Sequence, residues 1–348
     1  MPASPLHDVH VDAGARFTDF GGWTMPVQYR GVLDEHHTVR TAAGVFDVSH
    51  LGRFEVSGPG AVRLLETQLC NDINKIGPGR AQYTMALNER GGIEDDIIVW
   101  WVDDERWWVM PNGTNFDEML ARFRHAVQDD VTFVDVRSDT VLLAVQGPSA
   151  PATIETVLGF TPRRFRVETG EYAGSRVVAA GTGYTGEPGA EICVAAGTAE
   201  ALWTELIHKG VEPAGLGARD TLRLEMGFPL WGQDLTEDTT PVEAGLDWVV
   251  AWDHDFVGRT ALEAMRDDPP SKLVAFTTEG RIIPRHGYRV TSTTGSGLVT
   301  SGNYSPTLGH GIGLAYVTPP PSANDQLTVT VRGSEVPATM VDLPFIDR

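Results

Sequence analysis

Residues Gly181-Thr182-Gly183-Tyr184-Thr185-Gly186 match the glycine pattern G-x-G-x-x-G of dinucleotide-binding proteins, and they follow a run typical of a β-strand. The next segment, Glu187-Pro188-Gly189-Ala190-Glu191-Ile192-Cys193-Val194, is a turn followed by a second strand-like run. A dinucleotide site needs a helix at this point, because the helix N-terminus holds the pyrophosphate. The stretch therefore predicts a β-hairpin and argues against a Rossmann fold.

Most of the remaining chain consists of short β-rich runs. We expect strands at residues 97–102, 107–110, 131–136, 141–145, 176–180, 190–195, 246–252 and 272–277. Apolar residues at helical spacing predict helices at 114–127 and 199–209, and a third helix that begins near Leu216 and ends before Gly227. This mixture predicts an α+β protein with mainly antiparallel sheets.

The last part of the chain differs from the rest. From about Pro269 onward helical patterns are absent, and β-rich runs at 312–317, 327–332 and 336–341 alternate with Gly, Pro and Asn turns. Asp267-Asp268-Pro269-Pro270-Ser271 has the composition of a linker. We therefore expect a separate C-terminal β domain.

The charged residues are strongly unbalanced. The chain of 348 residues has 27 Lys and Arg against 47 Asp and Glu, a formal net charge of −20. Such a chain repels phosphate backbones and anionic membrane surfaces, so we expect no nucleic-acid partner and no membrane partner. Its only lysines are Lys75, Lys209 and Lys272, so arginine carries most of the positive charge. An anionic ligand would need a local arginine site.

Cysteine content and the first residues indicate a compartment. Cys70 and Cys193 are too few for a disulfide framework, which fits a reducing cytosol. Residues 1–8 lack the basic and apolar regions of a signal peptide, and no run approaches the roughly 18 apolar residues of a membrane span. We expect a cytoplasmic protein that is neither secreted nor membrane-spanning.

The ten histidines form no convincing set of metal ligands. Glu35-His36-His37 is the closest approach to such a set, and its polar surroundings favour a solvated helix face. We predict no metal site.

Three consecutive acids follow a glycine turn in Gly91-Gly92-Ile93-Glu94-Asp95-Asp96-Ile97-Ile98-Val99. Side chains alternate across a strand, so Asp95 and Asp96 face opposite ways and one of them is expected to point inward. A buried carboxylate is costly unless it is hydrogen-bonded or paired. The inward acid is either a turn-capping residue or a functional acid/base group, and local sequence leaves both open.

A second ambiguous segment is Gly215-Leu216-Gly217-Ala218-Arg219-Asp220. Glycines that open a helix let backbone N–H groups approach a ligand, and Arg219 could bind a carboxylate or a polar ring edge. The alternative is an ordinary ion pair between Arg219 and a neighbouring acid. Trp100, Trp101, Trp107 and Trp108 are typical of cross-strand core packing, although one of them could contact an aromatic ligand.

These segments, taken in order, resemble one family, the aminomethyltransferases (T-proteins) of the glycine cleavage system. The resemblance runs nearly end to end through 19–23, 25–26, 40–50, 88–96, 146–148, 183–187, 215–220, 299–302 and 305–309. It implies an α+β fold in which three mainly antiparallel-β domains form a cloverleaf around a central folate cavity. The implied domains are 1–50 with 138–268 (folate-binding), 51–137 (α/β, ferredoxin-like) and 269–348 (a C-terminal β-barrel or jelly roll).

The resemblance also implies site residues. Asp96 matches the catalytic carboxylate of the G-G-x-x-D-D turn, Glu191 matches the pterin-binding glutamate, and Arg219 matches the arginine of G-L-G-A-R-D. Tyr83, Asn112 and Leu51 are expected to line the same cavity. A pterin presents adjacent N–H donors that one carboxylate can accept, and Asp96 would orient the nucleophilic folate nitrogen and stabilise developing positive charge.

Three departures from the family pattern concern this site. Gly181 stands where an arginine is common, Leu51 stands where a methionine is common, and Phe165 is the nearest match to an expected aromatic pair. Arg163, Arg164 and Arg166 surround that phenylalanine. The arginines are either an ordinary solvated run or a patch for an acidic partner.

The implied activity uses tetrahydrofolate, which accepts a methylene group from an aminomethyl adduct on a lipoylated carrier (H) protein while ammonia is released. The alternatives are a folate-dependent demethylase or methyltransferase acting on a small methylated donor, and a non-catalytic folate-binding protein. The last kind carries a cysteine in a K-G-C-x-x-G-Q-like string, whereas this chain has none in residues 225–234. We expect a monomer.

Overall fold

A computed structural model describes residues 1–127, 130–322 and 325–348. The chain forms two compact units. The first unit comprises residues 1–66, 73–84 and 97–220, and the second comprises 67–72, 85–96 and 221–348. The finer division into three domains stays a prediction.

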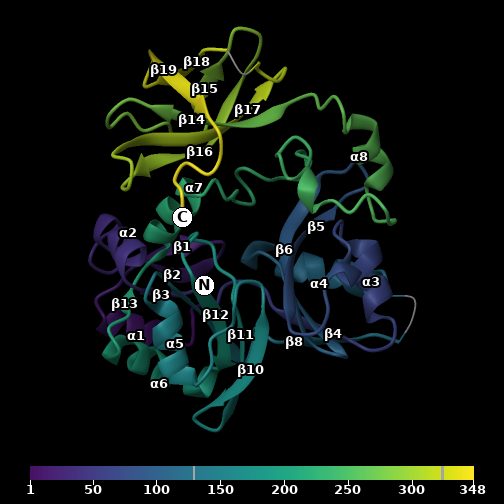
Figure 1. The fold of residues 1–348 in the computed structure, drawn as a ribbon, viewed down its shortest axis with the longest axis vertical. Helices are drawn as coiled ribbons and strands as arrows, with labels where there is room; N and C mark the ends of the chain where they lie inside the picture. The colour runs from purple at the N-terminus through teal and green to yellow at the C-terminus, as the bar shows by residue number, and fades with distance from the viewer. Residues whose placement is uncertain (128–129, 323–324) are drawn as a thin grey trace. The chain divides into compact units, whose positions relative to one another are not determined.

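A six-stranded sheet forms the centre of the first unit, with the strand order β10-β11-β12-β9-β3-β13. The strands are β3 (Gly44–Asp47), β9 (Thr140–Gln146), β10 (Val167–Tyr172), β11 (Ser175–Ala180), β12 (Gly189–Ala195) and β13 (Glu212–Pro213). Helices α5 (Ala150–Leu158) and α6 (Ala196–His208) pack on this sheet (Figure 1). Val145, Ile154, Ile192 and Leu202 are buried between them, so an apolar core supports the strands that carry the site.

A five-stranded sheet has the order β5-β6-β7-β4-β8. Its strands are β4 (Phe54–Ser57), β5 (Arg80–Leu87), β6 (Ile93–Asp103), β7 (Arg106–Met110) and β8 (Thr132–Asp135). Trp100 lies opposite Trp108 with ring centroids 5.9 Å apart, and Trp101 lies opposite Trp107 at 5.1 Å. The prediction that these tryptophans pack across strands is confirmed.

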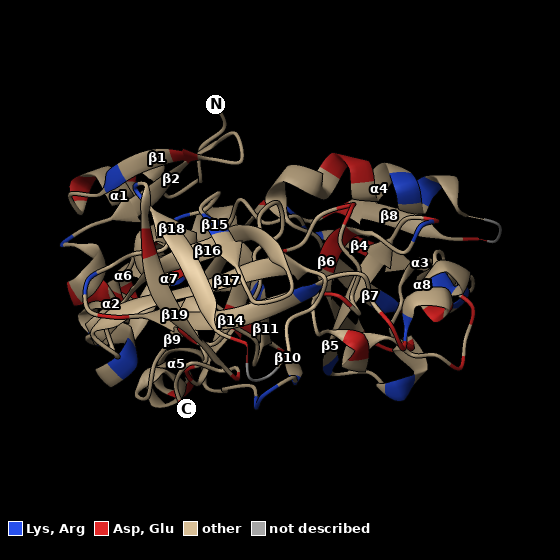
Figure 2. Ribbon diagram, turned by 90° about the horizontal axis from the view of Figure 1, so that it is seen from above, with Lys and Arg blue, Asp and Glu red and all other residues tan. Residues whose placement is uncertain are grey.

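The remaining elements of both units are short. They are β1 (Arg16–Phe20), β2 (Trp23–Gln28), α1 (His7–Asp12), α2 (Val32–Thr41), α3 (Ala61–Gln68), α4 (Phe116–His125), α7 (Leu216–Glu225), α8 (Arg259–Met265) and three 3-10 turns, Ile73–Lys75, Gly113–Asn115 and Asp247–Val249. In α4 the acids lie in the first turn and the bases in the last, as the red and blue ends of this helix show in Figure 2. This arrangement opposes the helix dipole at both ends and stabilises the helix.

The second unit contains a closed barrel with the order β14-β17-β16-β15-β18-β19, drawn from green to yellow in Figure 1. The strands are β14 (Lys272–Thr278), β15 (Arg289–Thr291), β16 (Ser296–Ser305), β17 (His310–Thr318), β18 (Leu327–Val331) and β19 (Ser334–Val341). Phe276, Val299, Val317 and Val329 fill its interior. The prediction of a C-terminal β domain is confirmed. Among the described residues, no helix has the length and apolar character needed to cross a bilayer.

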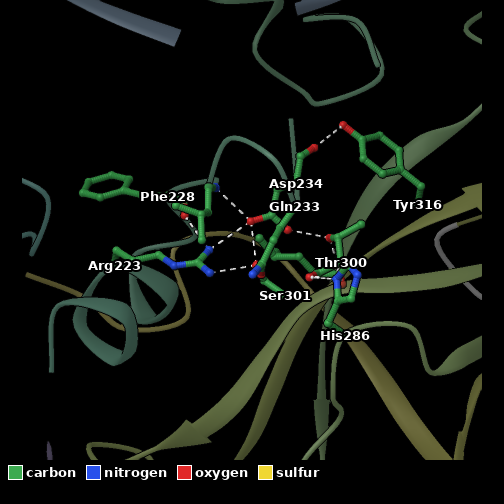
Figure 3. A network of polar contacts seen from close by, with 10 residues as sticks. Arg223, Phe228, Gln233, Asp234, His286, Thr300, Ser301 and Tyr316 are labelled. Carbon is green, nitrogen blue, oxygen red and sulfur yellow. Dashed lines mark hydrogen bonds and ion pairs between the residues drawn. The ribbon is translucent and has the colours of Figure 1, made fainter. Parts of the chain in front are cut away.

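A buried ion pair joins the end of α7 to the barrel (Figure 3). Arg223 Nη1 donates to Asp234 Oδ2 at 3.0 Å, and Arg223 Nη2 donates to Ser301 Oγ at 2.8 Å. Asp234 also accepts from the Thr300 hydroxyl on β16. Both charged side chains are at most 2% exposed. Such a pair is costly to bury but strongly destabilising to break.

The predicted helices are confirmed as α4, α6 and α7, and one predicted strand is wrong. Residues 246–252 contain the 3-10 turn Asp247–Val249 and no strand. Val249 N donates to Leu246 O, Val250 N donates to Asp247 O and Ala251 N donates to Cys70 O, so these amides are paired without forming a strand. A short apolar run carries no information about whether a neighbouring strand is available to pair with it.

Candidate active site

The glycine-rich stretch forms a hairpin loop between β11 and β12, which pair antiparallel, so the prediction of a hairpin is confirmed. The loop folds around Gln146, which is completely buried. Gln146 Oε1 accepts from Thr185 Oγ1 at 2.9 Å, and its Nε2 donates to Thr182 O at 3.1 Å. A Cβ at Gly183 would lie 1.9 Å from Gln146 Oε1, so only glycine fits there. Gly183 therefore allows the loop to pack closely on the buried amide of Gln146.

Glu191 lies on β12, directly after this loop, and is 5% exposed. Its Oε2 accepts from Thr182 Oγ1 at 2.5 Å. Arg219 lies on the first turn of α7, with its Cζ 4.8 Å from the centre of the Tyr184 ring. Burial lowers the pKa of Arg219, and the nearby carboxylate of Glu191 acts in the opposite direction. Glu191 and Arg219 are therefore near enough for their charges to interact.

The buried nitrogen atoms that have no hydrogen-bond partner within the described ranges include Arg219 Nη1 and His50 Nδ1. Burial and the cation of Arg219 lower the pKa of His50 to about 3, so the imidazole is neutral at physiological pH. Buried polar groups in folded proteins are normally paired. An unpaired guanidinium N–H beside a buried carboxylate is an incomplete polar site that a ligand with matching donors and acceptors would complete.

The position of Arg219 depends on Glu35, which is almost completely buried on α2. Glu35 Oε2 accepts from Gly215 N at 2.8 Å, just before α7 begins, and its Oε1 accepts from Tyr29 N and Gly31 N. The interpretation of Glu35-His36-His37 as a solvated face is wrong for Glu35 and His36, because both are buried. The carboxylate of Glu35 lies inside because it accepts hydrogen bonds from backbone N–H groups that would otherwise have no partner. No group of three or more metal-binding side chains occurs among the described residues.

Leu51 and Asn112 lie on adjoining segments of the first unit. Gly52 N donates to Pro111 O at 2.9 Å, so the residues after Leu51 and before Asn112 are hydrogen-bonded. Arg53 is completely buried and donates through Nη1 to Leu51 O at 2.8 Å. The backbone of Leu51 is therefore held in place by the buried side chain of Arg53. Tyr83 is partly buried on β5, and its part in the site stays a prediction.

Sequence reasoning missed a second ion pair that shapes the hairpin. Arg40 Nη1 on α2 donates to Glu187 Oε1 at 2.9 Å and to Thr185 O at 2.6 Å. Both charged side chains are at most 4% exposed. The loop is held by Arg40 and Gln146, and the start of α7 is held by Glu35. These positioning contacts can be recognised only in the structure, where the three side chains are buried among polar partners.

Asp47, at the end of β3, anchors the segment that leads to His50. It accepts hydrogen bonds from the Ser4 hydroxyl, from His10 Nε2 at 2.8 Å and from Ser49 N at 2.9 Å. Burial acts to raise the pKa of Asp47, but the hydrogen bonds and the charge of His10 outweigh it and hold the pKa below its ordinary value. The charged form of Asp47 therefore stabilises the folded state.

A depressed carboxyl pKa predicts acid sensitivity. The stabilisation by Asp47 is fully present above the unfolded pKa of about 3.9, and it is lost as the pH falls below that value through the folded pKa. We expect urea unfolding to show that the contribution of this group to the free energy of unfolding is present at pH 6 and decreases as the pH falls below about 3.9. Asp47→Asn should be less stable at pH 6 and show a smaller loss on acidification. An unchanged pH dependence in this variant would contradict the assignment.

The acidic turn belongs to the second unit up to Asp96. Asn88 Oδ1 accepts from Gly92 N at 2.9 Å, and Ile93 N donates to Thr236 O and Thr239 O. One acid was expected to point inward, and Asp95 is completely buried, whereas Asp96 is partly exposed. The catalytic role of Asp96 stays a prediction.

Comparison with known proteins agrees with this fold. Residues 6–254 match the family described as the GCVT N-terminal domain, and residues 272–347 match the glycine cleavage T-protein C-terminal barrel domain. The chain is 44% identical to the aminomethyltransferase of Synechococcus elongatus, over 99% of this chain and 95% of that protein. It is also 44% identical to the aminomethyltransferase of Frankia alni, over 99% and 97% of the two chains.

A solved structure gives the same result. The structure of the glycine cleavage system aminomethyltransferase T from Bartonella henselae superimposes with a TM-score of 0.92 at 33% identity, over 99% of this chain and 98% of that one. Fold and sequence thus define the class as one-carbon transferases built from an N-terminal α+β region and a C-terminal barrel. The chain belongs to the glycine cleavage T-protein family, and it is an aminomethyltransferase.

Proposed function

We propose that the reduced pteridine of tetrahydrofolate binds in the first unit beside Glu191 and Arg219. The observation that carries the proposal is the buried, unpartnered Nη1 of Arg219, a charged donor for which the protein supplies no acceptor among the described residues. Glu191 supplies the complementary acceptor, and it can receive the adjacent N–H groups along one pterin edge. The donor and acceptor set therefore fits a pterin.

The proposed reaction takes a methylene group from an aminomethyl adduct on the lipoyl arm of a carrier protein. Two folate nitrogens form bonds to the methylene carbon, while its bonds to the amino nitrogen and to the lipoyl sulfur break. The two protons lost from the folate nitrogens leave on ammonia and on the lipoyl thiol, so no oxidant or reductant is needed. Folate nitrogen is already nucleophilic, so positioning supplies most of the catalysis. In this proposal Asp96 orients that nitrogen and stabilises the positive charge that develops on it.

The direct test incubates the purified protein with tetrahydrofolate and aminomethyl-lipoyl carrier, and follows ammonia and methylene-tetrahydrofolate. We expect both products in equal amounts. A parallel reaction replaces the carrier with a small methylated amine. Product from the amine alone would identify a demethylase, and folate binding without product from either donor would overturn the proposed reaction.

Glu191→Gln tests the pterin site. A hydrogen bond to a charged group contributes about 1.5–3 kcal/mol, so we expect the KM for tetrahydrofolate to rise by roughly 10–100-fold. The kcat should change less, because the lost contact is present in both ground and transition states. Steady-state kinetics with saturating carrier measures both constants. Glu168→Gln, the same chemical change on β10, is the control, and an equal rise in that variant would contradict the assignment.

A further inference from the structure

A cavity in the first unit is lined by other residues than those assigned to the folate site. Its volume is about 230 Å³, and its walls come from four segments that are far apart in the sequence, near residues 3–5, 23, 49 and 135–140. Sites for drug-sized ligands have volumes of roughly 300–1,000 Å³, so this cavity suits a smaller molecule. It is here called the Arg137 pocket after its one arginine.

Arg137 brings a positive charge to the pocket and holds it against aromatic rings. Its Cζ lies 3.7 Å from the centre of the Phe116 ring and 5.6 Å from that of Trp23. Stacking uses the faces of the planar guanidinium, so the N–H groups along its edge stay available for hydrogen bonds. Within the described ranges no protein acceptor pairs with that edge. The pocket therefore contains a positioned cationic donor that a ligand can use.

A second arginine lies behind a lining residue and adds to the positive charge. Arg53 is completely buried, and its Nη2 donates to the carbonyl oxygen of Thr140 at 3.2 Å and to its hydroxyl oxygen at 3.3 Å. Burial lowers the pKa of Arg53, and the charge of Arg137 acts in the same direction, so the two cations are near each other. Burial also lowers the pKa of Arg137, although Asp135 and Asp117 oppose it. A carboxylate bound at Arg137 would offset the repulsion between the two guanidinium groups.

The pocket also offers a negatively charged acceptor. Asp135 belongs to the lining, and its Oδ1 accepts from Arg137 N at 2.8 Å and from Ser138 N at 3.2 Å. These two bonds hold the carboxylate in place, and its Oδ2 has no partner in the described part of the chain. An anion without a positive group would be repelled by Asp135, whereas a ligand that carries both charges would pair with Arg137 and with Asp135.

Hydrogen bonds between the walls shape the pocket before any ligand binds. The N-terminal wall and the wall at Ser49 are joined through Asp47, which accepts from the Ser4 hydroxyl and from Ser49 N. The last wall is joined to the same region because Val136 N donates to Arg53 O at 3.0 Å. Such preorganisation lowers the entropic cost of binding a small ligand.

We propose that the Arg137 pocket binds a free α-amino acid with a small apolar side chain. The carboxylate of the ligand accepts from the guanidinium edge of Arg137, and its ammonium group donates to Asp135 Oδ2. The side chain of the ligand packs against the apolar lining residues Pro5 and Trp23. This inference is independent of the proposed function, because no step of the folate reaction uses the pocket.

The test is an NMR titration of the full chain with L-alanine, without folate or carrier. We expect a Kd of about 1 mM or below for L-alanine, and binding at least about tenfold weaker for acetate and for methylammonium, which each carry one of the two charged groups. Arg137→Met should weaken L-alanine binding by about tenfold or more, because it removes the charged donor. Asp135→Asn keeps the Oδ1 acceptor of the two backbone bonds, so it should weaken L-alanine similarly without weakening acetate.

The matched control is Arg124→Met. Arg124 also lies over an aromatic ring of the first unit, with its Cζ 5.9 Å from the centre of Phe133, so the variant removes a stacked arginine outside the lining of the pocket. It should leave L-alanine binding unchanged. If Arg137→Met does not fold, as judged by its thermal unfolding curve, the comparison of Asp135→Asn with Arg124→Met decides.

Three results would overturn this inference. The first is no binding of L-alanine at about 50 mM, well above the expected Kd. The second is an equal loss of binding in Arg124→Met. The third is that acetate or inorganic phosphate binds as tightly as L-alanine, which would make the pocket a general anion site in which Asp135 has no part.

Discussion

Asp96→Asn should lower turnover by about 100-fold while leaving the affinity for tetrahydrofolate nearly unchanged. The substitution keeps the size and shape of the side chain but removes the negative charge. A correctly placed acid or base group contributes typically 10²–10⁴-fold to a rate, and a carboxylate that stabilises positive charge only in the transition state contributes little to binding. Single-turnover kinetics and equilibrium titration with tetrahydrofolate measure the two effects separately.

The matched control is Asp95→Asn, the neighbouring acid on the same strand. Asp95 is completely buried and faces the opposite side of β6, so its substitution should lower stability and spare the turnover of the folded protein. Full activity in Asp96→Asn would remove Asp96 from the catalytic role. If Asp95→Asn lost as much turnover as Asp96→Asn, the loss would come from disturbing strand β6 and not from removing the carboxylate of Asp96.

The features that sequence predicted well are local. The hairpin at 181–186 follows from glycines, a β-turn and two strand-like runs within a few residues. The helix predicted at 114–127, and observed at Phe116–His125, follows from its apolar spacing. Both patterns depend on short stretches of chain, so neither needs knowledge of the fold.

The features that sequence could not predict depend on distant partners. Glu35 accepts from Gly215 N, 180 residues further along the chain, and nothing in Glu35-His36-His37 indicates this contact. The prediction of a strand at 246–252 was wrong because an apolar run does not show which partner its backbone finds. Val249 N donates within the segment, and Ala251 N donates to the distant Cys70 O. Glu191 and Arg219 were identified through family resemblance, and their proximity is visible only in the structure.

Arg223→Met should cause the largest loss of stability in the second unit. Methionine keeps most of the volume but removes the cation, which leaves the buried carboxylate of Asp234 without its ion-pair partner. Breaking a buried pair from one side costs about 3–5 kcal/mol. Thr300 and Ser301 on β16 both donate to Asp234, so the loss of stability should be largest in this part of the second unit. It should be measured as faster hydrogen exchange of the neighbouring β16 amides.

The double variant Arg223→Met/Asp234→Leu distinguishes an unpaired charge from a simple loss of contacts. Replacing both partners with apolar residues removes the buried charge, so the double variant should be more stable than Arg223→Met alone. Arg259→Met makes the same chemical change in an exposed pair with Asp255 and Glu263, and it should alter stability little. The single variant Asp234→Leu completes the comparison. If the loss of stability in the double variant equals the sum of the losses in Arg223→Met and Asp234→Leu, the two residues contribute through separate hydrogen bonds and not through their charge balance. If the double variant is instead more stable than Arg223→Met, the main contribution of Arg223 is to neutralise the buried charge of Asp234. That carboxylate accepts hydrogen bonds both from Thr300 on β16 and from Arg223 at the end of α7.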